Sequence, residues 1–381
     1  MLERWVCFNC WLFSLVLWIC PFSIPQVLLE KLLHECPDVR RVYVLMREKK
    51  GVSVTQRLDE LLDSPVFSGT KRTPKSLCQE RVTPVYGDAS KERLGTSDFD
   101  WSTLVNEVNV IINSAASVRF DDPMVKALGI NCMSAISCLQ LCREAKQCVS
   151  FVHVSTCYSN CQFETIDEKF YPTKITYEEL MVKSKNMSSD ELDDLCRKEY
   201  FDGRPNSYVF SKALAEDYLR RHGVRLMVGL PLAITRLAIV TPSVAEPEPG
   251  FADVTQGGVF VLFCQGLGAL RTFKYDPNIM LHVISVDTSV NAILAIAYLT
   301  ATRPDYHGRI YNAAKQVATN DQCFKTSINI VQTYPSINAF RPPTYIRPSK
   351  STILYQYNRW INEWLFVVLL QFVLRPFGFK Q

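Results

Sequence analysis

The sequence lacks the compositional marks of several protein classes. Its 381 residues include only 15 Gly and 20 Pro, which excludes collagen and low-complexity polymers. The 42 Lys and Arg residues nearly balance the 38 Asp and Glu residues, and the net charge of +4 is spread along the chain, so no nucleic-acid-binding surface is indicated. With 48% hydrophobic residues, the chain can bury a large core and is not disordered. Its length fits one large domain or one domain with a smaller cap.

The 14 cysteines do not have the arrangement of a small disulfide-bonded protein. They are scattered and several lie in apolar runs, so in a chain of this length we expect buried, reduced thiols. Cys7 and Cys10 are spaced like a pair of zinc ligands, but no second pair follows at a matching distance. We therefore expect no metal site.

The N-terminal segment has no charge over a long stretch. Residues 5–20 are uncharged and strongly apolar, and Pro21 and Pro25 interrupt the run that follows. A helix that spans a bilayer needs about 20 apolar residues. Three interpretations remain open: a signal peptide that follows Arg4, a signal anchor, or a buried first strand of a soluble sheet over residues 15–20.

From about residue 26 the apolar pattern predicts alternating helices and strands. The strands show little polar alternation, which is typical of a parallel sheet covered on both faces. We therefore predict an α/β fold with a doubly wound parallel sheet. The predicted helices span residues 27–36, 54–62, 127–145 and 211–221, and the predicted strands span residues 42–46, 81–86, 108–112, 150–154 and 227–240.

Tyr208 and Lys212 form the strongest chemical signal. Their spacing of four residues places both on one face of a helix. A tyrosine hydroxyl titrates near 10, and a neighbouring ammonium group favours the phenolate and lowers that pKa, so the pair can act as an acid and base. The apolar strand before them ends at Ser155 and Thr156, where a hydroxyl could bind a carbonyl oxygen. In doubly wound sheets ligands gather at the carboxyl ends of the strands. The alternative is an accidental pair on an exposed helix.

Further short segments share a pattern with one family: residues 27–33, 44–51, 64–67, 87–88, 115–121, 153–158, 246–251, 286–287 and Asn291. Together with the Ser/Thr, Tyr and Lys residues, they resemble extended short-chain dehydrogenases/reductases and, more narrowly, alcohol-forming fatty acyl-CoA reductases. The resemblance covers about residues 26–360. It implies a Rossmann-like fold with a small substrate-side cap.

The resemblance also implies a reaction and catalytic roles. The family reduces a long-chain acyl-CoA through an aldehyde to a fatty alcohol and releases CoA, with NADPH as the reductant. Tyr208 would protonate the carbonyl oxygen, and Lys212 would hold the nicotinamide ribose and tune Tyr208. Ser155 or Thr156 would hydrogen-bond the substrate oxygen, and the sequence does not choose between them.

The expected cofactor contacts begin after the second strand. Arg47 would bind the adenosine 2′-phosphate, with Lys49 or Lys50 assisting, which fits NADPH because an NADH site usually has an acidic residue there. The alternative is a solvated run of charges.

Other expected cofactor residues follow the next strands. Asp88 would contact the adenine, and Ala115 and Ala116 would let the backbone approach the cofactor. Asn131 would orient the active-site helix or a proton relay.

Three consecutive domains are expected: an apolar segment (1–25), a reductase domain with a substrate cap (26–320) and the truncated start of a C-terminal helical domain (321–381). The uncharged stretch 364–374 is short for a membrane span and fits a buried or interfacial helix. The resemblance implies association with an endoplasmic reticulum or peroxisomal membrane, with the catalytic domain facing the cytosol.

The sequence departs from the family at the cofactor loop. The family has a glycine-rich run there, but this chain has Cys20 to Gln26 and no glycine before Gly51. Glycine N–H groups bind the pyrophosphate and proline has none to offer, so about three hydrogen bonds of about 1.5–3 kcal/mol each would be lost. Either the N-terminus is a gene-model artefact joined at Val27, or the protein is a degenerate reductase. Asn113 also stands where the family more often has His, and Leu237 where it has Pro.

Two other functions therefore stay open. The first is a cofactor-dead relative that binds acyl-CoA or a partner at a membrane without catalysis. The second is an extended reductase for sterols or nucleotide sugars, against which residues 47–51 and 118–121 argue.

Overall fold

The computed structural model describes residues 13–18, 23–49, 51–67, 74–224, 229–252, 257–337, 339, 341–342 and 351–365. The chain divides into two units. The first consists of Met1–Ala238, Pro242–Phe251 and Ile284–Ala314, and the second of Ile239–Thr241, Ala252–Val283 and Lys315–Gln381. The units are interleaved along the sequence, whereas the predicted domains are consecutive.

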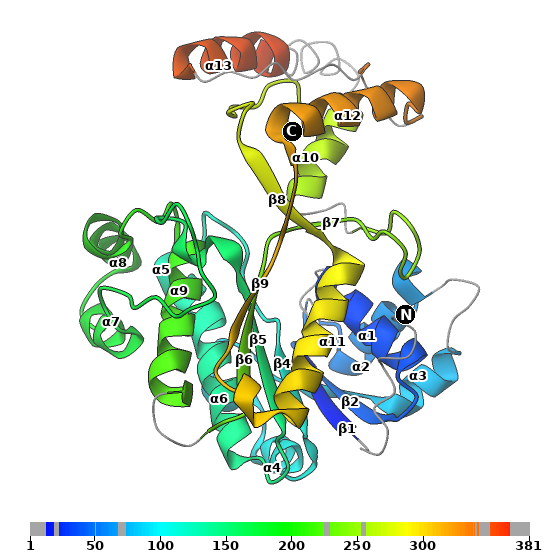
Figure 1. The fold of residues 1–381 in the computed structure, drawn as a ribbon, viewed down its shortest axis with the longest axis vertical. Helices are drawn as coiled ribbons and strands as arrows, with labels where there is room; N and C mark the ends of the chain where they lie inside the picture. The colour runs from blue at the N-terminus through cyan, green and yellow to red at the C-terminus, as the bar shows by residue number, and fades with distance from the viewer. Residues whose placement is uncertain are drawn as a thin grey trace. The chain divides into compact units, whose positions relative to one another are not determined.

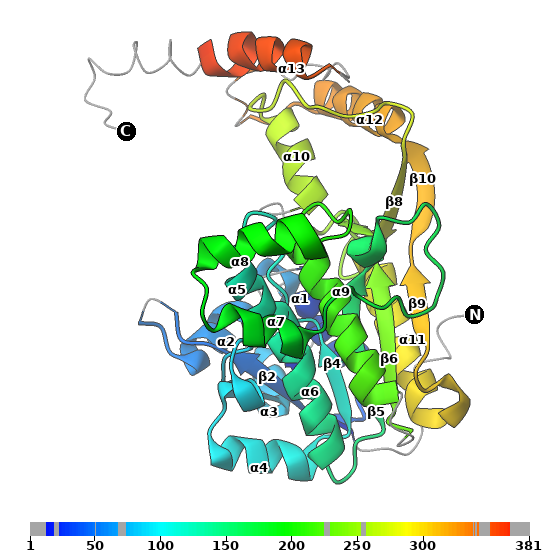
Figure 2. The ribbon, with the colours of Figure 1, turned by 90° about the vertical axis from the view of Figure 1, so that its left-hand side faces the viewer.

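A seven-stranded sheet organises the first unit (Figures 1 and 2). Its strand order is β3-β2-β1-β4-β5-β6-β9, and every neighbouring pair is parallel. All seven residues of β5 are buried, as expected for a central strand covered on both faces. The strands are β1 (Phe13–Trp18), β2 (Val39–Met46), β3 (Val82–Tyr86), β4 (Val110–Asn113), β5 (Ser150–Thr156), β6 (Leu232–Leu237) and β9 (Ile310–Ala313).

Helices cover both faces of this sheet. The pair α6 and α9 packs against β5 and against each other, and α11 packs against β5, β6 and α1, which confirms the predicted doubly wound α/β fold (Figures 1 and 2). The helices are α1 (Ser23–Glu35), α2 (Val54–Leu62), α3 (Lys75–Arg81), α4 (Asp98–Glu107), α5 (Met124–Ala127), α6 (Met133–Glu144), α7 (Tyr177–Ser184), α8 (Ser189–Leu195), α9 (Ser207–Leu219) and α11 (Val286–Thr302).

The N-terminal apolar run contributes a strand. Residues 13–18 form β1, which pairs in parallel with β2 on one side and β4 on the other. Of the three interpretations of this run, the structure therefore corresponds to the first strand of the sheet. A segment paired on both sides in a sheet does not span a bilayer in that state. Residues 5–12 and 19–20 of the run lie outside the described residues.

The helix of Tyr208 and Lys212 begins four residues earlier than predicted. The Asn206 side chain accepts a hydrogen bond of 3.0 Å from the Val209 N–H, so α9 starts at Ser207. Both predicted catalytic residues consequently lie on the helix, with Tyr208 in its first turn. Helix α2 has the predicted bounds, because Ser53 and Gln56 form a capping box at its start.

One helix in the described part of the chain is long and apolar enough to cross a membrane. It runs over Met124–Glu144, and most of its apolar stretch is buried inside the protein. Five consecutive residues, Leu128–Cys132, form a π-helical turn between α5 and α6. The helix packs against α9 and the sheet, so its apolar character already has an explanation in core packing.

The second unit contains a small sheet with the strand order β10-β8-β7. Strands β8 and β10 are antiparallel. Its strands are β7 (Ile239–Thr241), β8 (Met280–Ser285) and β10 (Lys315–Thr319), and its helices are α10 (Gly257–Gly266), α12 (Asn320–Thr333) and α13 (Thr352–Arg359). Tyr275 and Phe324 form the centre of its small core.

Candidate active site

The predicted site residues collect at one edge of the large sheet. Arg47 follows β2, Asp88 follows β3, Ala115 follows β4, and Thr156 ends β5. All these strands are parallel, so their carboxyl ends lie at the same edge, which is where doubly wound sheets bind ligands. The strand order places the expected adenosine contacts toward β3 and β2, and the expected reacting groups at β5.

Tyr208 and Lys212 both face the end of β5. The Lys212 ammonium is buried and donates a hydrogen bond of 2.9 Å to the Val154 carbonyl oxygen. The Tyr208 side chain is half-buried and hydrogen-bonds to the Thr156 side chain. Its ring centroid lies 5.8 Å from that of Phe120. The helix and the strand thus bring an acid, a cation and a hydroxyl together.

The environment of Tyr208 keeps its phenol protonated. Burial raises the pKa of Tyr208 to about 12, against a smaller lowering by the hydrogen bond with Thr156. From the sequence, Lys212 is expected to lower this pKa. In the structure Thr156 supplies it instead, because the Lys212 ammonium is directed to the Val154 carbonyl. A protonated phenol is the form that a proton donor requires.

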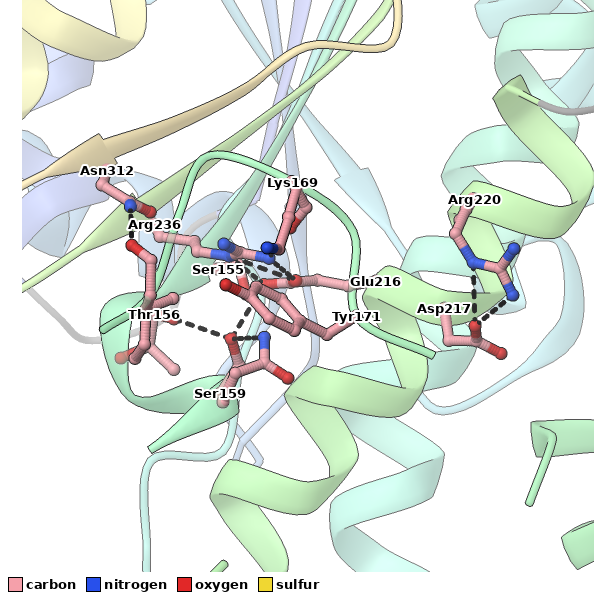
Figure 3. Close-up of polar contacts among 12 residues, drawn as sticks. Ser155, Thr156, Ser159, Lys169, Tyr171, Glu216, Asp217, Arg220, Arg236 and Asn312 are labelled. Carbon is pink, nitrogen blue, oxygen red and sulfur yellow. Dashed lines mark hydrogen bonds and ion pairs between the residues drawn. The ribbon is translucent and has the colours of Figure 1, made fainter. Parts of the chain in front are cut away.

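The side chains of Ser155 and Thr156, between which the sequence does not choose, have different partners. The Ser155 hydroxyl donates a hydrogen bond of 2.5 Å to Glu216 Oε1, inside the protein (Figure 3). Thr156 contacts Tyr208, and its Oγ1 also accepts a hydrogen bond of 3.2 Å from the Tyr158 N–H. Thr156 is therefore the hydroxyl on the Tyr208 side.

Sequence reasoning missed two charged residues next to the site. Glu216 and Arg236 are buried and form an ion pair of 2.6 Å. A signal existed for each: Glu216 lies four residues after Lys212 on the same helix face, and Arg236 is a charged residue within the apolar strand β6. A charge in such a strand needs a buried partner. Nothing in the sequence identified that partner.

Arg47 and Asp88 form the opposite end of the site. The Arg47 side chain is 65% exposed, and its Nη1 lies 3.8 Å from Asp88 Oδ2. Burial alone would raise the pKa of Asp88, but hydrogen bonds from the Ser90 N–H and hydroxyl, together with Arg47, hold it below its usual range. Lys49 is exposed in the same turn after β2. An exposed guanidinium beside an ionised carboxylate can bind a phosphate and a polar base edge.

A cavity of about 560 Å³ borders Arg47. Its lining combines polar groups with an apolar wall, which suits a planar heterocycle next to an anion. A Cβ at Gly87 would lie 2.7 Å from the Leu94 backbone oxygen, so glycine lets the Asp88 segment pack this closely. The lining includes Arg47, Ser90, Leu128, Gly129, Met133 and Tyr177.

The turn after β4 is compact. Ala115 and Ala116 are buried, and the Ala115 N–H donates to Asn113 Oδ1 over 3.1 Å. The Asn113 amide nitrogen also lies 3.2 Å from both Ser134 Oγ and His153 Nδ1. Small side chains on a fixed turn allow a ligand to approach the backbone.

Asn131 lies in the π-helical turn and is completely buried. Its amide nitrogen donates to Ser211 Oγ over 2.9 Å, and its Oδ1 accepts from the Ser117 N–H over 2.8 Å. Both ends of this amide are bonded within the protein. The geometry suits the orientation of α9 rather than direct contact with a cofactor.

The residues present fit the adenosine end and the nicotinamide end of a dinucleotide. They fit the pyrophosphate between these ends less well. Helix α1 begins at Ser23, after β1, where such a fold binds a pyrophosphate. Pro25 lies in its first turn and has no N–H. Residues 19–22 lie outside the described residues. Among residues 23–49 there is no glycine, so the start of α1 offers fewer N–H groups than a glycine-rich loop.

No metal centre accompanies the site in the described part of the chain. There, no group of three or more His, Cys, Asp or Glu side chains lies close enough together to hold an ion.

Comparison with known proteins identifies a family. The family described as "Male sterility protein", an NAD-binding family, matches residues 24–293. Fatty acyl-CoA reductase 1 of Mus musculus is 31% identical over 339 residues, which cover 88% of this chain and 64% of that protein. Fatty acyl-CoA reductase wat of Drosophila melanogaster is 34% identical over 288 residues, which cover 75% of this chain and 54% of that protein. The chain thus spans less than two thirds of the length of these relatives.

Solved structures show the same fold. The reductase domain of a nonribosomal peptide synthetase from Mycobacterium tuberculosis superposes with a TM-score of 0.62 at 17% identity, over 92% of this chain and 76% of that one. The terminal R domain of the myxalamid pathway gives a TM-score of 0.60 at 20% identity, over 84% and 70%. With the family match, the relatives and the Thr156, Tyr208 and Lys212 arrangement in agreement, this chain belongs to the fatty acyl-CoA reductase family.

Proposed function

We propose that this protein reduces long-chain fatty acyl-CoA to fatty alcohol by way of an aldehyde, with release of CoA and with NADPH as reductant. The observation that carries the proposal is the contact of Thr156 with Tyr208, one helical turn before Lys212, in a chain of this family. The bound nicotinamide would supply the hydride for each of the two reduction steps. All other chemistry would come from the chain's own groups.

Tyr208 and Thr156 would act on the substrate oxygen. As the carbonyl carbon is reduced, negative charge develops on its oxygen, and a protonated phenol can neutralise it. The Thr156 hydroxyl would hold the same oxygen next to Tyr208. Lys212, whose ammonium donates to the Val154 carbonyl, would hold the nicotinamide ribose and supply a positive charge on the same helix face as Tyr208.

Arg47 is our basis for proposing NADPH over NADH. Its exposed guanidinium, with Lys49 nearby, would bind a 2′-phosphate, and Asp88 would accept from the adenine amino group. Ala115 and Ala116 would let the cofactor lie against the turn after β4, and Asn131 would act by positioning α9.

The start of α1 favours a second candidate function. Without a glycine-rich turn, and with Pro25 in the first helical turn, a cofactor-dead relative that binds acyl-CoA or a partner at a membrane is the alternative. The two candidates differ in their affinity for NADPH and in whether they form fatty alcohol.

A membrane surface is a further part of the proposal. The last described helix exposes large apolar side chains at helical spacing, and Trp and Tyr among them are typical of membrane interfaces. These exposed residues are Ile353, Leu354, Tyr357, Trp360, Ile361, Trp364 and Leu365. Residues 366–374 of the predicted interfacial stretch lie outside the described residues. Because β1 belongs to the sheet, we propose attachment through this helix, at the cytosolic face of the endoplasmic reticulum or peroxisome.

The experiment is fatty alcohol production in a host that makes none. The chain and its Tyr208→Phe variant are expressed in parallel, alcohols are quantified in lipid extracts, and NADPH binding is measured on the purified proteins. We expect alcohol from the first protein and at least 100-fold less from the second. Folded protein with no alcohol and no NADPH binding would instead support the cofactor-dead relative.

The membrane contact is tested by flotation of the purified protein with liposomes. We expect the chain to float with the liposomes and a Trp360→Ser/Trp364→Ser variant to do so less.

A further inference from the structure

A single buried carboxylate gathers the polar groups behind Thr156. Glu216 Oε1 accepts hydrogen bonds from Ser155 Oγ over 2.5 Å and from Ser159 Oγ over 3.0 Å. Arg236 binds both carboxylate oxygens, through Nε at 3.1 and 3.2 Å and through Nη2 at 2.6 Å (Figure 3). Ser155 and Ser159 lie on either side of Thr156 in sequence, so Glu216 holds the backbone that presents the Thr156 hydroxyl.

The guanidinium of Arg236 connects this carboxylate to a surface segment. Its Nη1 donates to the Asp167 carbonyl over 3.0 Å and its Nη2 to the Lys169 carbonyl over 2.9 Å. The guanidinium carbon lies 5.6 Å from the centroid of the Tyr171 ring. Arg236 is fully buried, so these contacts fix its orientation.

Strand β9 holds the same segment from a second side. The Asn312 N–H donates to Glu168 Oε1 over 2.7 Å, and the Asn312 amide donates to the Ile166 carbonyl over 2.8 Å. Residues 166–171 contain no helix or strand, yet they are tied to both β6 and β9. We call residues 166–171 the clamped segment.

The clamped segment lies on the substrate half of the site edge. The expected cofactor contacts follow β2, β3 and β4, on one side of Thr156 in the strand order. Arg236 and Asn312 are in the carboxyl-terminal halves of β6 and β9, on the other side of Thr156. A substrate whose carbonyl reaches Thr156 and Tyr208 therefore meets the β5, β6 and β9 side of the edge.

We infer that Glu216 and Arg236 form a positioning unit that fixes the clamped segment as a wall of the acyl thioester site and aligns Thr156 for the reaction. This inference rests on the proposed function. Neither residue contacts substrate; both act through Ser155, Thr156 and the clamped segment. A buried ion pair is weak evidence for stability, because apolar residues of similar volume often stabilise as well. Two nitrogens of Arg236 bind two oxygens of Glu216, and this geometry fixes the orientation of both side chains. Orientation matters because a shift of about 1 Å in an active site can reduce the rate about 100-fold.

Asp217 offers a matched control on the same helix. It is also buried, is next in sequence to Glu216, and binds Arg220 over 2.7 Å and Arg221 over 2.9 Å. In Figure 3 this pair lies apart from the cluster around Glu216. Asp217→Asn and Glu216→Gln each remove one buried negative charge from α9. Only Glu216→Gln changes the hydrogen bonds to Ser155 and to Arg236, which holds the clamped segment.

The test compares these two variants in the full chain. For Glu216→Gln we expect KM for acyl-CoA to rise about tenfold or more and kcat to fall, with an NADPH Kd within about twofold of the parent chain. Hydrogen exchange of residues 166–171 should become faster in Glu216→Gln and stay unchanged in Asp217→Asn. Arg236→Lys keeps the charge but loses the planar group that binds both carboxylate oxygens, so it should behave like Glu216→Gln. Glu216→Asp keeps the carboxylate, so its KM and kcat should lie between those of Glu216→Gln and the parent chain.

Two outcomes separate the inference from the proposed function. Equal changes in KM, kcat and exchange for Glu216→Gln and Asp217→Asn would overturn the positioning unit and leave a structural ion pair. If the parent chain makes no alcohol but exchange rises only in Glu216→Gln, the proposed reaction fails while the fixing of the clamped segment is supported. If Glu216→Gln does not fold, Arg236→Lys and Glu216→Asp provide the same comparison.

Discussion

The Asn131 amide donates a hydrogen bond to Ser211, the residue that directly precedes Lys212. The π-helical turn between α5 and α6 is thereby joined to the helix that carries both Tyr208 and Lys212. The same amide accepts from the Ser117 N–H, so the turn after β4 is joined as well. The orientation of α9 thus depends on a residue that touches neither reacting group.

Replacing Asn131 should therefore affect both stability and activity. Asn131→Ala removes the hydrogen-bond partner of the half-buried Ser117 N–H, which should destabilise the protein by about 1–3 kcal/mol. We also expect kcat to fall, because α9 loses a fixed contact next to Lys212. Urea unfolding and steady-state kinetics measure the two effects. Asn106, an exposed residue of α4, provides the control, and Asn106→Ala should change stability by less than about 0.5 kcal/mol.

Ser155→Ala and Thr156→Val should differ strongly in rate. Thr156 contacts Tyr208, so loss of its hydroxyl should lower kcat about 100-fold or more. Ser155 donates to Glu216 instead, so its loss should lower kcat by less than about tenfold and destabilise the fold by about 1 kcal/mol. Measuring kcat for alcohol formation by both purified variants shows which hydroxyl the reaction needs. The opposite order would assign the catalytic hydroxyl to Ser155.

Arg47→Ala should selectively weaken NADPH binding. A charge-assisted contact with phosphate contributes about 1.5–3 kcal/mol, so the Kd for NADPH should rise about 10- to 100-fold while the Kd for NADH stays constant. Arg309, which is about as exposed but lies near the start of β9, serves as the control. Equal weakening of both nucleotides would show that Arg47 does not bind the 2′-phosphate.

His153 should make stability fall in mildly acidic solution. Burial, with a smaller contribution from Lys212, holds the pKa of His153 well below 6.5 in the folded protein. The unfolded chain titrates near 6.5, so below that pH it binds one more proton than the folded chain. The free energy of unfolding should then fall with decreasing pH, by up to about 1.4 kcal/mol per pH unit, and no such loss should occur above pH 7.

His153→Gln provides the comparison. Denaturant unfolding at pH 7.5, 6.5 and 5.5 should give a flatter dependence for this variant than for the parent chain. The Asn113 amide donates to His153 Nδ1, which leaves the proton on Nε2, and Nε2 has no partner among the described residues. Parallel pH dependences for the two proteins would mean that His153 becomes protonated within the fold.

Much of the secondary structure could be predicted from the sequence because it depends on residues that are close together in the chain. The apolar strand at residues 150–154 and the helix at 54–62 follow from hydrophobic pattern and capping residues, and the structure has both. The spacing of Tyr208 and Lys212 on a helix face is likewise local. The start of α9 was predicted four residues late, although the Asn206 cap that sets it is an equally local signal.

The sequence by itself determined the α/β class and the family, because each depends on residue types at short spacing, and the same kind of pattern predicts Tyr208 and Lys212 as the acid and base pair. Tertiary structure alone decided the rest. It gave residues 13–18 a place between β2 and β4, directed Thr156 rather than Ser155 to Tyr208, and joined Glu216 to Arg236 across 20 positions of sequence. Such choices depend on which strands become neighbours, and a strand's partners are set by packing over the whole sheet.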